Sequence, residues 1–312
     1  MRSQRSTERE MRVLNDEQAR RWQADYHELM HIGAPASTEE KVLRLIHNKA
    51  YEVASAIAGG ASVLDVGCNI GYGTRLLSGA AREAIGIDVS QKALREAKAR
   101  QGGGLAGFVL AEGKALPFPC GRFDMVVAFQ LLEHLFSYEE FFVELKRVLG
   151  PAAVLLFSTP NKVVRLDEGM APWNPMHTRE FDASELGLLL GAHFPFVRLL
   201  GLTGHQGIRS VELSRLADAR RKARRLAKRT WRSAYAVADS VLPGSARRRL
   251  RTLLRRAVLH GRQQGESFSS RDLYYSDRDL NSALDLLAVC RPIGDEPSEI
   301  LSTILARESD TS

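Results

Sequence analysis

The feature that most constrains the fold of this chain is an apolar run that breaks at an acid into a glycine-rich turn. Residues 63–78 read VLDVGCNIGYGTRLLS and predict a strand that ends near Asp65, then a loop and a helix. Gly67, Gly71 and Gly73 lack a Cβ and can adopt positive φ, so the loop can pass close to a ligand. The next helix would point its free N–H groups at the same ligand. The segment therefore predicts a ligand-binding turn at the end of a buried strand.

A second strand that ends in a second acid follows about twenty residues later. In nucleotide-binding α/β folds, an acid at this sequence spacing accepts hydrogen bonds from the ribose hydroxyl pair. This acid is Asp88, in the run AIGIDVS. The loop itself alternates small or turn-prone residues, with Asn69 at its centre, and does not follow the G-x-G-x-x-G spacing of dinucleotide sites. Asn tolerates the left-handed backbone region best among non-glycine residues. The pattern indicates a nucleoside-containing cofactor other than a dinucleotide.

Taken together, these motifs resemble the class I S-adenosylmethionine-dependent methyltransferases over roughly residues 53–202. The resemblance implies an α/β, Rossmann-like fold with a seven-stranded, mostly parallel sheet and helices on both faces. It also implies S-adenosyl-L-methionine as cofactor, and an acid near the adenine amino group at Glu112. The cofactor-binding residues that it implies are Asp65, Gly67, Cys68, Asn69, Gly71, Gly73, Asp88, Val89, Glu112, Gly113 and Gln130.

Three of these acids also have plain structural interpretations. Asp65 could cap the turn that follows it. Asp88 could be the N-cap of the next helix, although Ser90 could fill that place. Glu112 could be an exposed loop acid. We favour the cofactor role for Asp65 and Asp88, and we leave the two interpretations of Glu112 open.

The resemblance also points to an acceptor pocket beyond the fourth and fifth strands. It implies that Glu133 and His134 lie at the mouth of this pocket. The segment NPMHTREF, residues 174–181, resembles one found in methyltransferases of glycan and lipid-linked sugar synthesis, and it brings His177 in or beside the pocket. A neutral histidine can remove a hydroxyl proton near pH 7. His134 and His177 are therefore candidate bases, with Glu133 as a possible orienting partner, although either histidine could instead only pack or cap.

Composition agrees with a single large enzyme domain carrying an attachment. The 312 residues are 44% hydrophobic, enough to bury a full core. Cys68, Cys120 and Cys290 are widely separated, so we expect reduced thiols in a cytosolic protein and no metal site. The amino terminus has no apolar signal segment, and no uncharged run reaches the ~18 to 20 residues of a membrane span.

The charge divides the chain into regions. Residues 209–262 hold fifteen arginines and two lysines against three acids, a net charge of +14, although the whole chain carries only +7. This segment predicts two basic amphipathic helices separated at Pro243 and Gly244. The expected regions are a polar N-terminal tail or helix (1–36), the methyltransferase core (37–207), an Arg-rich helical insertion between the last two strands (208–272), and the last strand with a C-terminal tail (273–312).

The function expected from these features is O-methylation of a saccharide or lipid-linked glycan by a cytoplasmic enzyme, held on the inner face of the cell membrane by the insertion. Basic amphipathic helices can bind anionic membranes, nucleic acid or their own domain, and we rank nucleic acid last. A diffusible small-molecule acceptor, such as a polyketide or quinone, is the alternative enzyme hypothesis. An RNA-binding protein on a methyltransferase scaffold is the non-enzyme alternative. Residues 130–133 read QLLE and not the Asn/Asp-Pro-Pro-aromatic pattern expected of amino-group methylation on bases. This difference argues against nucleobase N-methylation.

Overall fold

The computed structural model describes residue 35 and residues 37–100, 106–174, 176–239 and 268–305. Its centre is one eight-stranded sheet in the order β3-β2-β1-β4-β5-β8-β6-β7. Six strands run in the same direction, and β8 and β7 run against them. The strands are β1 (Ser62–Val66), β2 (Glu83–Asp88), β3 (Ala106–Leu110), β4 (Phe123–Phe129), β5 (Leu149–Pro160), β6 (Phe196–Gly204), β7 (Leu273–Ser276) and β8 (Asp285–Arg291).

The predicted α/β fold is confirmed, with one correction to its strand count. The expected seven strands are present, and the described residues add the short edge strand β7, which pairs antiparallel with β6 through residues 273–276. This strand alternates buried and half-buried residues over only four positions. A strand this short carries too little periodicity to be separated from a loop in the sequence.

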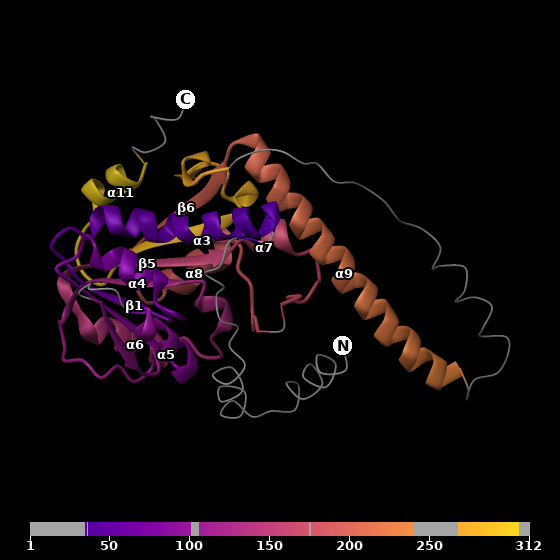
Figure 1. Ribbon diagram of the computed structural model, residues 1–312, viewed down its shortest axis with the longest axis horizontal. Helices are drawn as coiled ribbons and strands as arrows, with labels where there is room; N and C mark the ends of the chain where they lie inside the picture. Colours follow the sequence, from indigo (N-terminus) through magenta and orange to yellow (C-terminus); the bar gives the residue numbers. More distant parts are fainter. Residues whose placement is uncertain (1–34, 36, 101–105, 175, 240–267, 306–312) are drawn as a thin grey trace.

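Helices cover both faces of the sheet (Figure 1). One core packs α3 and α11 against the face that presents Val63, Met125 and Val127, and the other packs α6 and α8 against the opposite face. The helices are α3 (Thr38–Ile57), α4 (Tyr72–Ser78), α5 (Gln91–Ala99), α6 (Glu139–Val148), α7 (Lys162–Arg165), α8 (Ala183–Gly191), α9 (Gln206–Asp239) and α11 (Ser298–Leu305), with 3-10 turns η1 (Leu132–His134), η3 (Ser270–Asp272) and η4 (Leu280–Ser282).

Capping residues set the start of two helices that frame the site. Helix α3 begins after Ser37, whose side chain accepts a hydrogen bond from the backbone N–H of Glu40 at 3.1 Å. Helix α8 begins after Asp182, which exchanges hydrogen bonds with Glu185 in a capping box. Helix α3 packs across the sheet, and its residues His47 and Tyr51 line the cavity described below.

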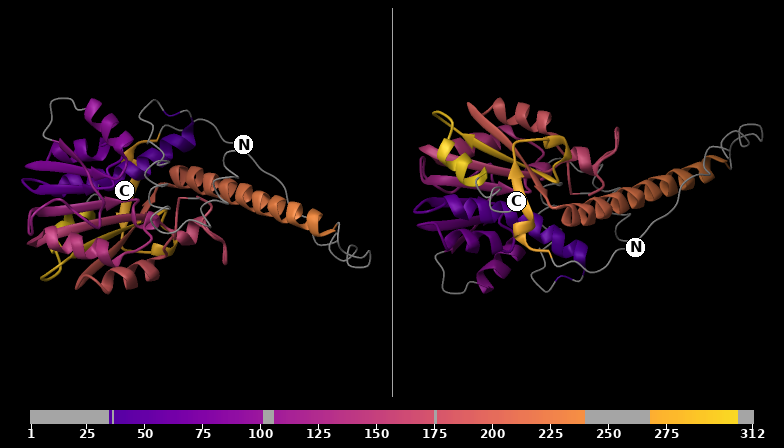
Figure 2. Two further views of the ribbon diagram at one scale, coloured as in Figure 1. Left: turned by 90° about the horizontal axis from the view of Figure 1, so that it is seen from below. Right: turned by 90° about the horizontal axis from the view of Figure 1, so that it is seen from above.

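The Arg-rich insertion begins as one long helix, α9, which packs on the domain and then extends away from it (Figures 1 and 2). Ile208 and Leu216 are buried, and the nearly buried Glu212 pairs with Arg215 at 2.5 Å. The predicted turn at Pro243 and Gly244, the second predicted helix and the N-terminal tail lie outside the described residues, except for residue 35. In the part that the structure describes, no helix has the length and apolarity needed to cross a bilayer.

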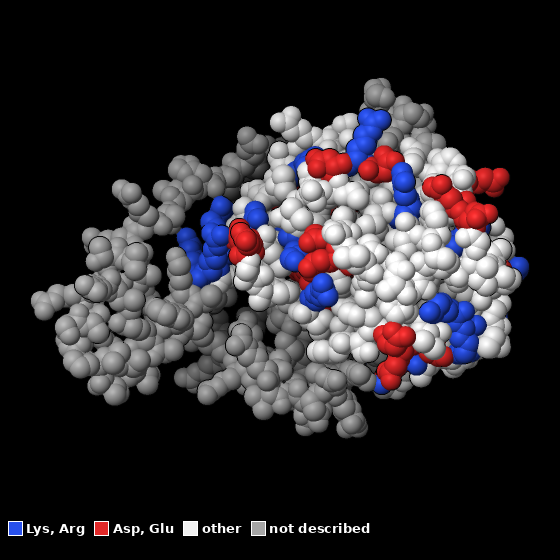
Figure 3. All heavy atoms as spheres, turned by 180° about the vertical axis from the view of Figure 1, so that it is seen from behind, with Lys and Arg blue, Asp and Glu red and all other residues white. Residues whose placement is uncertain are grey.

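Basic side chains in the described part of α9 have acidic neighbours on the domain and on the helix itself. Arg220 and Arg224 both pair with Asp167, and Arg221 pairs with Asp218. On the face drawn in Figure 3, basic and acidic side chains of the described residues are interspersed. The first half of α9 is therefore attached to the core by apolar contacts and by ion pairs.

Candidate active site

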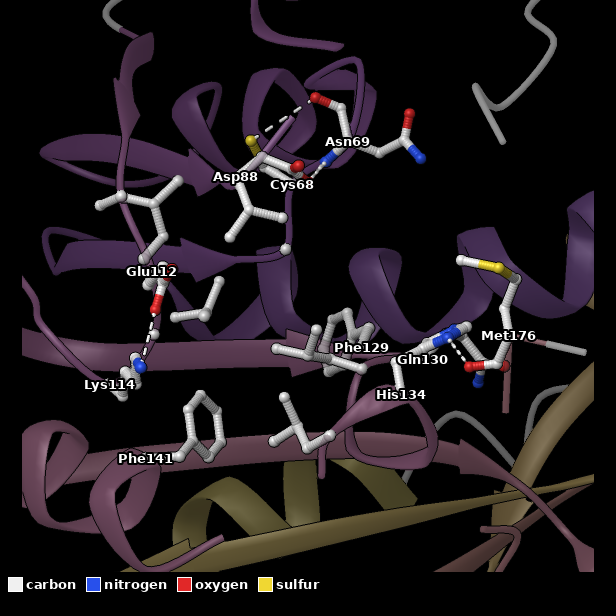
Figure 4. A pocket seen from close by; sticks show the side chains of 18 of the residues that line it. Cys68, Asn69, Asp88, Glu112, Lys114, Phe129, Gln130, His134, Phe141 and Met176 are labelled. Atoms are coloured by element: carbon white, nitrogen blue, oxygen red, sulfur yellow. Dashed lines mark hydrogen bonds and ion pairs between the residues drawn. The ribbon is translucent and has the colours of Figure 1, made fainter. Parts of the chain in front are cut away.

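A cavity of about 790 Å³ lies at the carboxyl ends of β1, β2 and β4. Strand β1 has β2 as its neighbour on one side and β4 on the other, so the strand order reverses at β1. The cavity lies at this topological switch point, which is where ligands bind in open α/β sheets. Its volume falls within the range of small-molecule pockets. Figure 4 shows Asp88, Glu112 and Phe141 toward one end and Gln130, His134 and Met176 toward the other. We call these the cofactor end and the acceptor end.

The glycine loop after β1 has the strained backbone that its sequence predicts. Gly67, Asn69 and Gly71 have φ angles of 79°, 49° and 70°. Gly67 and Asn69 line the cavity, together with Cys68. Gly71 and Gly73 do not line it: a Cβ would overlap the Phe108 ring at Gly71 and the Tyr51 ring at Gly73. These two glycines admit neighbouring aromatic rings rather than a ligand.

Asp65 is fully buried beneath the loop and does not line the cavity. Its carboxylate accepts hydrogen bonds from Thr74 Oγ1 at 2.6 Å and from the Tyr51 hydroxyl at 3.2 Å. Burial raises the pKa of Asp65 to about 7, although these two hydrogen bonds oppose the shift. Asp65 thus ties β1 to helices α3 and α4 and holds the loop in place.

Asp88 lines the cavity at the end of β2 and is 4% exposed. Its Oδ2 accepts from the Asn69 N–H at 2.9 Å and its Oδ1 accepts from the Ser90 N–H at 2.8 Å. Ser90, not Asp88, caps helix α5, because its hydroxyl accepts from the Ala93 N–H at 3.2 Å. A carboxylate has about four acceptor positions, so Asp88 retains capacity for a ribose hydroxyl pair.

Apolar side chains form a slot beside Asp88. Val89 is 40% exposed and Leu110 is 55% exposed, although both line the cavity. At Gly113 a Cβ would come within 2.8 Å of the Phe141 ring, so glycine lets this ring pack against the backbone at the cavity wall. Glu112 lies at the edge of the slot and forms an ion pair with Lys114 at 3.3 Å. A flat, apolar slot with a polar edge fits an adenine ring.

Three aromatic rings that the sequence analysis did not select stand at the centre of the cavity wall: Tyr51, Tyr72 and Phe129. The Tyr51 ring lies edge-on to the other two, with centroids 5.2 Å from Tyr72 and 4.9 Å from Phe129. Aromatic faces attract cations, so this group fits the sulfonium of S-adenosyl-L-methionine. Tyr51 belongs to the buried stripe of α3, so nothing in its sequence position distinguishes it from an ordinary core residue.

Gln130 lines the cavity at the end of β4 in a left-handed conformation, with φ at 52°. Its side-chain amide donates to Asp285 Oδ2 at 2.8 Å and to Ser158 Oγ at 3.3 Å. A positive φ at a non-glycine residue is uncommon and is retained where surrounding contacts enforce it. The contacts from β5 and β8 therefore fix the point where the chain turns into η1.

His134 follows on η1 and lines the acceptor end. Its Nδ1 lies 3.0 Å from the carbonyl oxygen of Met176, which also lines the cavity. A carbonyl only accepts hydrogen bonds, so Nδ1 donates, and Nε2 carries the lone pair of the neutral ring. His134 thus presents a basic nitrogen in a defined ring orientation.

Glu133 and His177 lie behind His134 and do not line the cavity. Glu133 is fully buried and accepts from Thr159 Oγ1 at 3.0 Å, and burial raises its pKa. His177 Nδ1 lies 2.8 Å from Glu180 Oε1, and the rings of His177 and His134 meet edge to face at 4.8 Å. The structure therefore brings all three candidate catalytic residues together, with only His134 at the cavity.

His47 is a further cavity residue that the sequence analysis missed. It lies on α3, where burial and the positive charges of Arg215 and Arg165 lower its pKa to about 4. Its ring is therefore neutral at pH 7. The signal that could have identified it is its position one helical turn before Tyr51, on the same face of α3.

A class I methyltransferase is the class of enzyme that this sheet order and this cavity define. A family model described as a methyltransferase domain matches residues 64–157. A probable S-adenosylmethionine-dependent methyltransferase of Mycolicibacterium smegmatis is 35% identical over 57% of this chain and 69% of its own length. A similarly described protein of Mycobacterium tuberculosis is 34% identical over 53% of this chain and 60% of its own length.

A ubiquinone biosynthesis O-methyltransferase of Thiobacillus denitrificans is 31% identical over 45% of this chain and 62% of its own length. The chain belongs to the S-adenosylmethionine-dependent methyltransferase family. It is a methyltransferase enzyme whose cofactor is S-adenosyl-L-methionine, as the sequence predicts.

Proposed function

We propose that this enzyme methylates a hydroxyl group on an acceptor with an apolar body, such as a quinol or another phenol. The observation that carries this proposal is the composition of the acceptor end. There His134 is surrounded by apolar side chains that line the same cavity: Phe129, Leu131, Leu135, Phe136 and Met176. An apolar ring would bury against these side chains, and its hydroxyl would approach the basic nitrogen of His134.

The chain's own residues divide the work between the two ends. The bound cofactor supplies an activated methyl group on a sulfonium. Asp88 and the slot of Val89 and Leu110 would hold its nucleoside, and the Tyr51 ring would hold its cationic centre. His134 accepts the hydroxyl proton at Nε2 as the oxygen attacks. Because such a transfer needs an in-line approach, positioning and exclusion of water supply most of the catalysis.

The glycan acceptor expected from residues 174–181 is the competing hypothesis. It draws support from Met176, which belongs to that segment and lines the cavity. A saccharide presents many hydroxyls, and each needs a polar partner when it is buried. The apolar wall offers few such partners, and the Thiobacillus denitrificans relative is described as an O-methyltransferase of ubiquinone biosynthesis. Both observations favour the phenolic acceptor.

Helix α9 supports a cytoplasmic enzyme that rests on the inner face of the cell membrane, where an apolar acceptor would be found. It extends beyond the core, and Lys222 and Arg225 are exposed on it. Each basic residue near an anionic surface adds about 1 kcal/mol of attraction. Sedimentation with phosphatidylglycerol vesicles tests this: the full chain should sediment and a variant without residues 209–262 should not. Sedimentation of that variant would contradict it.

The acceptor is tested by methyl transfer from labelled S-adenosyl-L-methionine to matched panels of catechols, hydroquinones with apolar tails, and lipid-linked saccharides. The proposal expects turnover with phenolic acceptors, a rate that increases with the apolar tail, and loss of turnover in His134→Ala. Turnover confined to saccharides would establish the glycan hypothesis instead.

A further inference from the structure

Three side chains behind the acceptor end converge on one point: Glu133, His134 and His177. Each offers one atom able to bind a metal, and these atoms all lie within 4.8 Å of one another. Glu133 and His134 come from η1, whereas His177 comes from the segment that follows α7. Residues more than forty positions apart therefore contribute to one group, as the 3.0 Å contact between His134 and Met176 also reflects.

The carboxylate of Glu133 has an oxygen without a hydrogen-bond partner. Its Oε2 accepts from Thr159 Oγ1 at 3.0 Å, whereas Oε1 is buried and has no partner among the described residues. The whole residue is 0% exposed. Buried polar atoms of native proteins nearly always have a partner, and an exception calls for an explanation such as an ion. A cation bound between Glu133 and the two histidines would give this oxygen a partner.

Both histidines are held in the orientation typical of metal ligands. His134 Nδ1 lies 3.0 Å from the Met176 carbonyl oxygen, and His177 Nδ1 lies 2.8 Å from Glu180 Oε1. Glu180 is itself fixed by two hydrogen bonds from Arg165, at 2.9 and 3.2 Å. Because these partners are acceptors, each Nδ1 donates and each Nε2 keeps its lone pair. Metal-binding histidines donate their other ring N–H to a carboxylate or a backbone carbonyl in this way.

We propose that Glu133, His134 and His177 form a binding site for a divalent transition metal ion of the zinc class. Two imidazole nitrogens and one carboxylate oxygen suit zinc, whereas Mg²⁺ prefers oxygen ligands throughout. Bonds of ~2.0 to 2.1 Å to one ion hold neighbouring ligand atoms roughly 3.3 Å apart, so binding would shorten the separations between the three ligand atoms by up to about 1.5 Å.

The position of the site suggests its use. Three protein ligands leave zinc a further coordination position, the arrangement of catalytic rather than structural sites. His134 is the ligand that also lines the cavity, so the ion borders the acceptor end. With the ion bound, His134 Nε2 is a ligand and does not accept the hydroxyl proton; the ion instead would lower the pKa of a neighbouring acceptor hydroxyl, which then loses its proton to water. This use of the ion rests on the proposed function, but the presence of the ion does not.

The test is a calorimetric titration of untagged, chelator-stripped full-length protein with Zn²⁺, with Mg²⁺ as the control ion. We expect one Zn²⁺ per chain and no binding of Mg²⁺. Glu133→Gln and His177→Ala should weaken Zn²⁺ binding by about 100-fold or more, and Glu180→Gln by about 10- to 100-fold. His205→Ala removes an exposed histidine outside the group and should bind as the wild type does.

Binding of S-adenosylhomocysteine is measured on every variant, so that loss of the fold is separated from loss of a ligand. The proposal would be overturned if the wild type did not bind one Zn²⁺ per chain. It would also be overturned if the folded Glu133→Gln and His177→Ala variants bound zinc as tightly as the wild type. Zinc binding without methyl transfer to any phenol would keep the metal site and reject the proposed function. Methyl transfer by zinc-free protein would keep the proposed function and reject the ion's role in the reaction.

Discussion

The two ends of the cavity are built from different parts of the chain. Apart from Phe141 of α6, the cofactor end comes from described residues between 66 and 114, where β1, β2 and β3 lie side by side and their loops meet. The acceptor end combines α3, η1 and Met176, and it is supported by β5 and β8. The cofactor end therefore depends on backbone shape within local motifs, whereas the acceptor end depends on side chains brought together by the whole fold.

The largest effect that distinguishes the ends is expected from His134→Ala. Removing the basic nitrogen should lower kcat by about 10² to 10⁴, the range for general acid–base residues. The dissociation constant of S-adenosylhomocysteine should not change, because the cofactor end is intact. Turnover kinetics and calorimetry measure the two quantities, with His205→Ala as the matched control. Equal loss of turnover and of cofactor binding would contradict the role of His134 at the acceptor end.

Asp88→Ala tests the cofactor end. The change removes the acceptor for the Asn69 and Ser90 N–H groups and for a ribose, so S-adenosylhomocysteine affinity should fall by about 10- to 100-fold, as for hydrogen bonds to a charged group. Calorimetric titration provides the measurement. Glu112→Ala is the comparison, because this exposed acid forms an ion pair with Lys114 at the edge of the slot and its removal should cost less affinity. A larger loss from Glu112→Ala would reverse the proposed roles.

Gly73→Ala tests whether the glycine motif serves packing. The added Cβ would overlap the Tyr51 ring, so the free energy of unfolding should fall by roughly 1 to 3 kcal/mol, as for overpacked cores. Denaturant unfolding measures it. Gly59→Ala is the control, since a Cβ there meets nothing within 4 Å. Equal stability of the two variants would contradict the packing role.

A smaller effect is expected from His47 as the pH is lowered. Its folded pKa of about 4 lies below the ordinary value of 6.5, so between these values the unfolded chain binds the additional proton. This histidine therefore makes the fold less stable as the pH falls from 6.5 toward 4. The melting temperature of the wild type should decrease more over that interval than that of His47→Gln. Identical pH profiles would rule out this contribution.

The same contrast explains what the sequence could predict. The glycine-rich loop after β1, the left-handed backbone tolerated by Asn69 and the position of Asp88 all follow from local patterns, and the structure contains them. His134 was expected near the pocket because it follows the end of a parallel strand, and the structure places it at the cavity. Local reasoning did not separate the glycines that line the cavity from Gly73, which admits a ring supplied by α3.

Long-range contacts account for what was missed. Tyr51 and His47 read as ordinary residues of an amphipathic helix, and only the packing of α3 across the sheet makes them cavity residues. Glu133 was expected at the pocket mouth, but it turns inward to Thr159 on β5. The edge strand β7 was hidden because four residues after a long insertion carry almost no periodic signal.

The most direct test of this account is calorimetric titration with S-adenosylhomocysteine of the wild type, Asp88→Ala and His134→Ala, with NADH as the comparison ligand. The account predicts micromolar binding of S-adenosylhomocysteine alone, weakened in Asp88→Ala and unchanged in His134→Ala. Absence of binding to the wild type, or the same loss in both variants, would contradict a cavity with separate cofactor and acceptor ends.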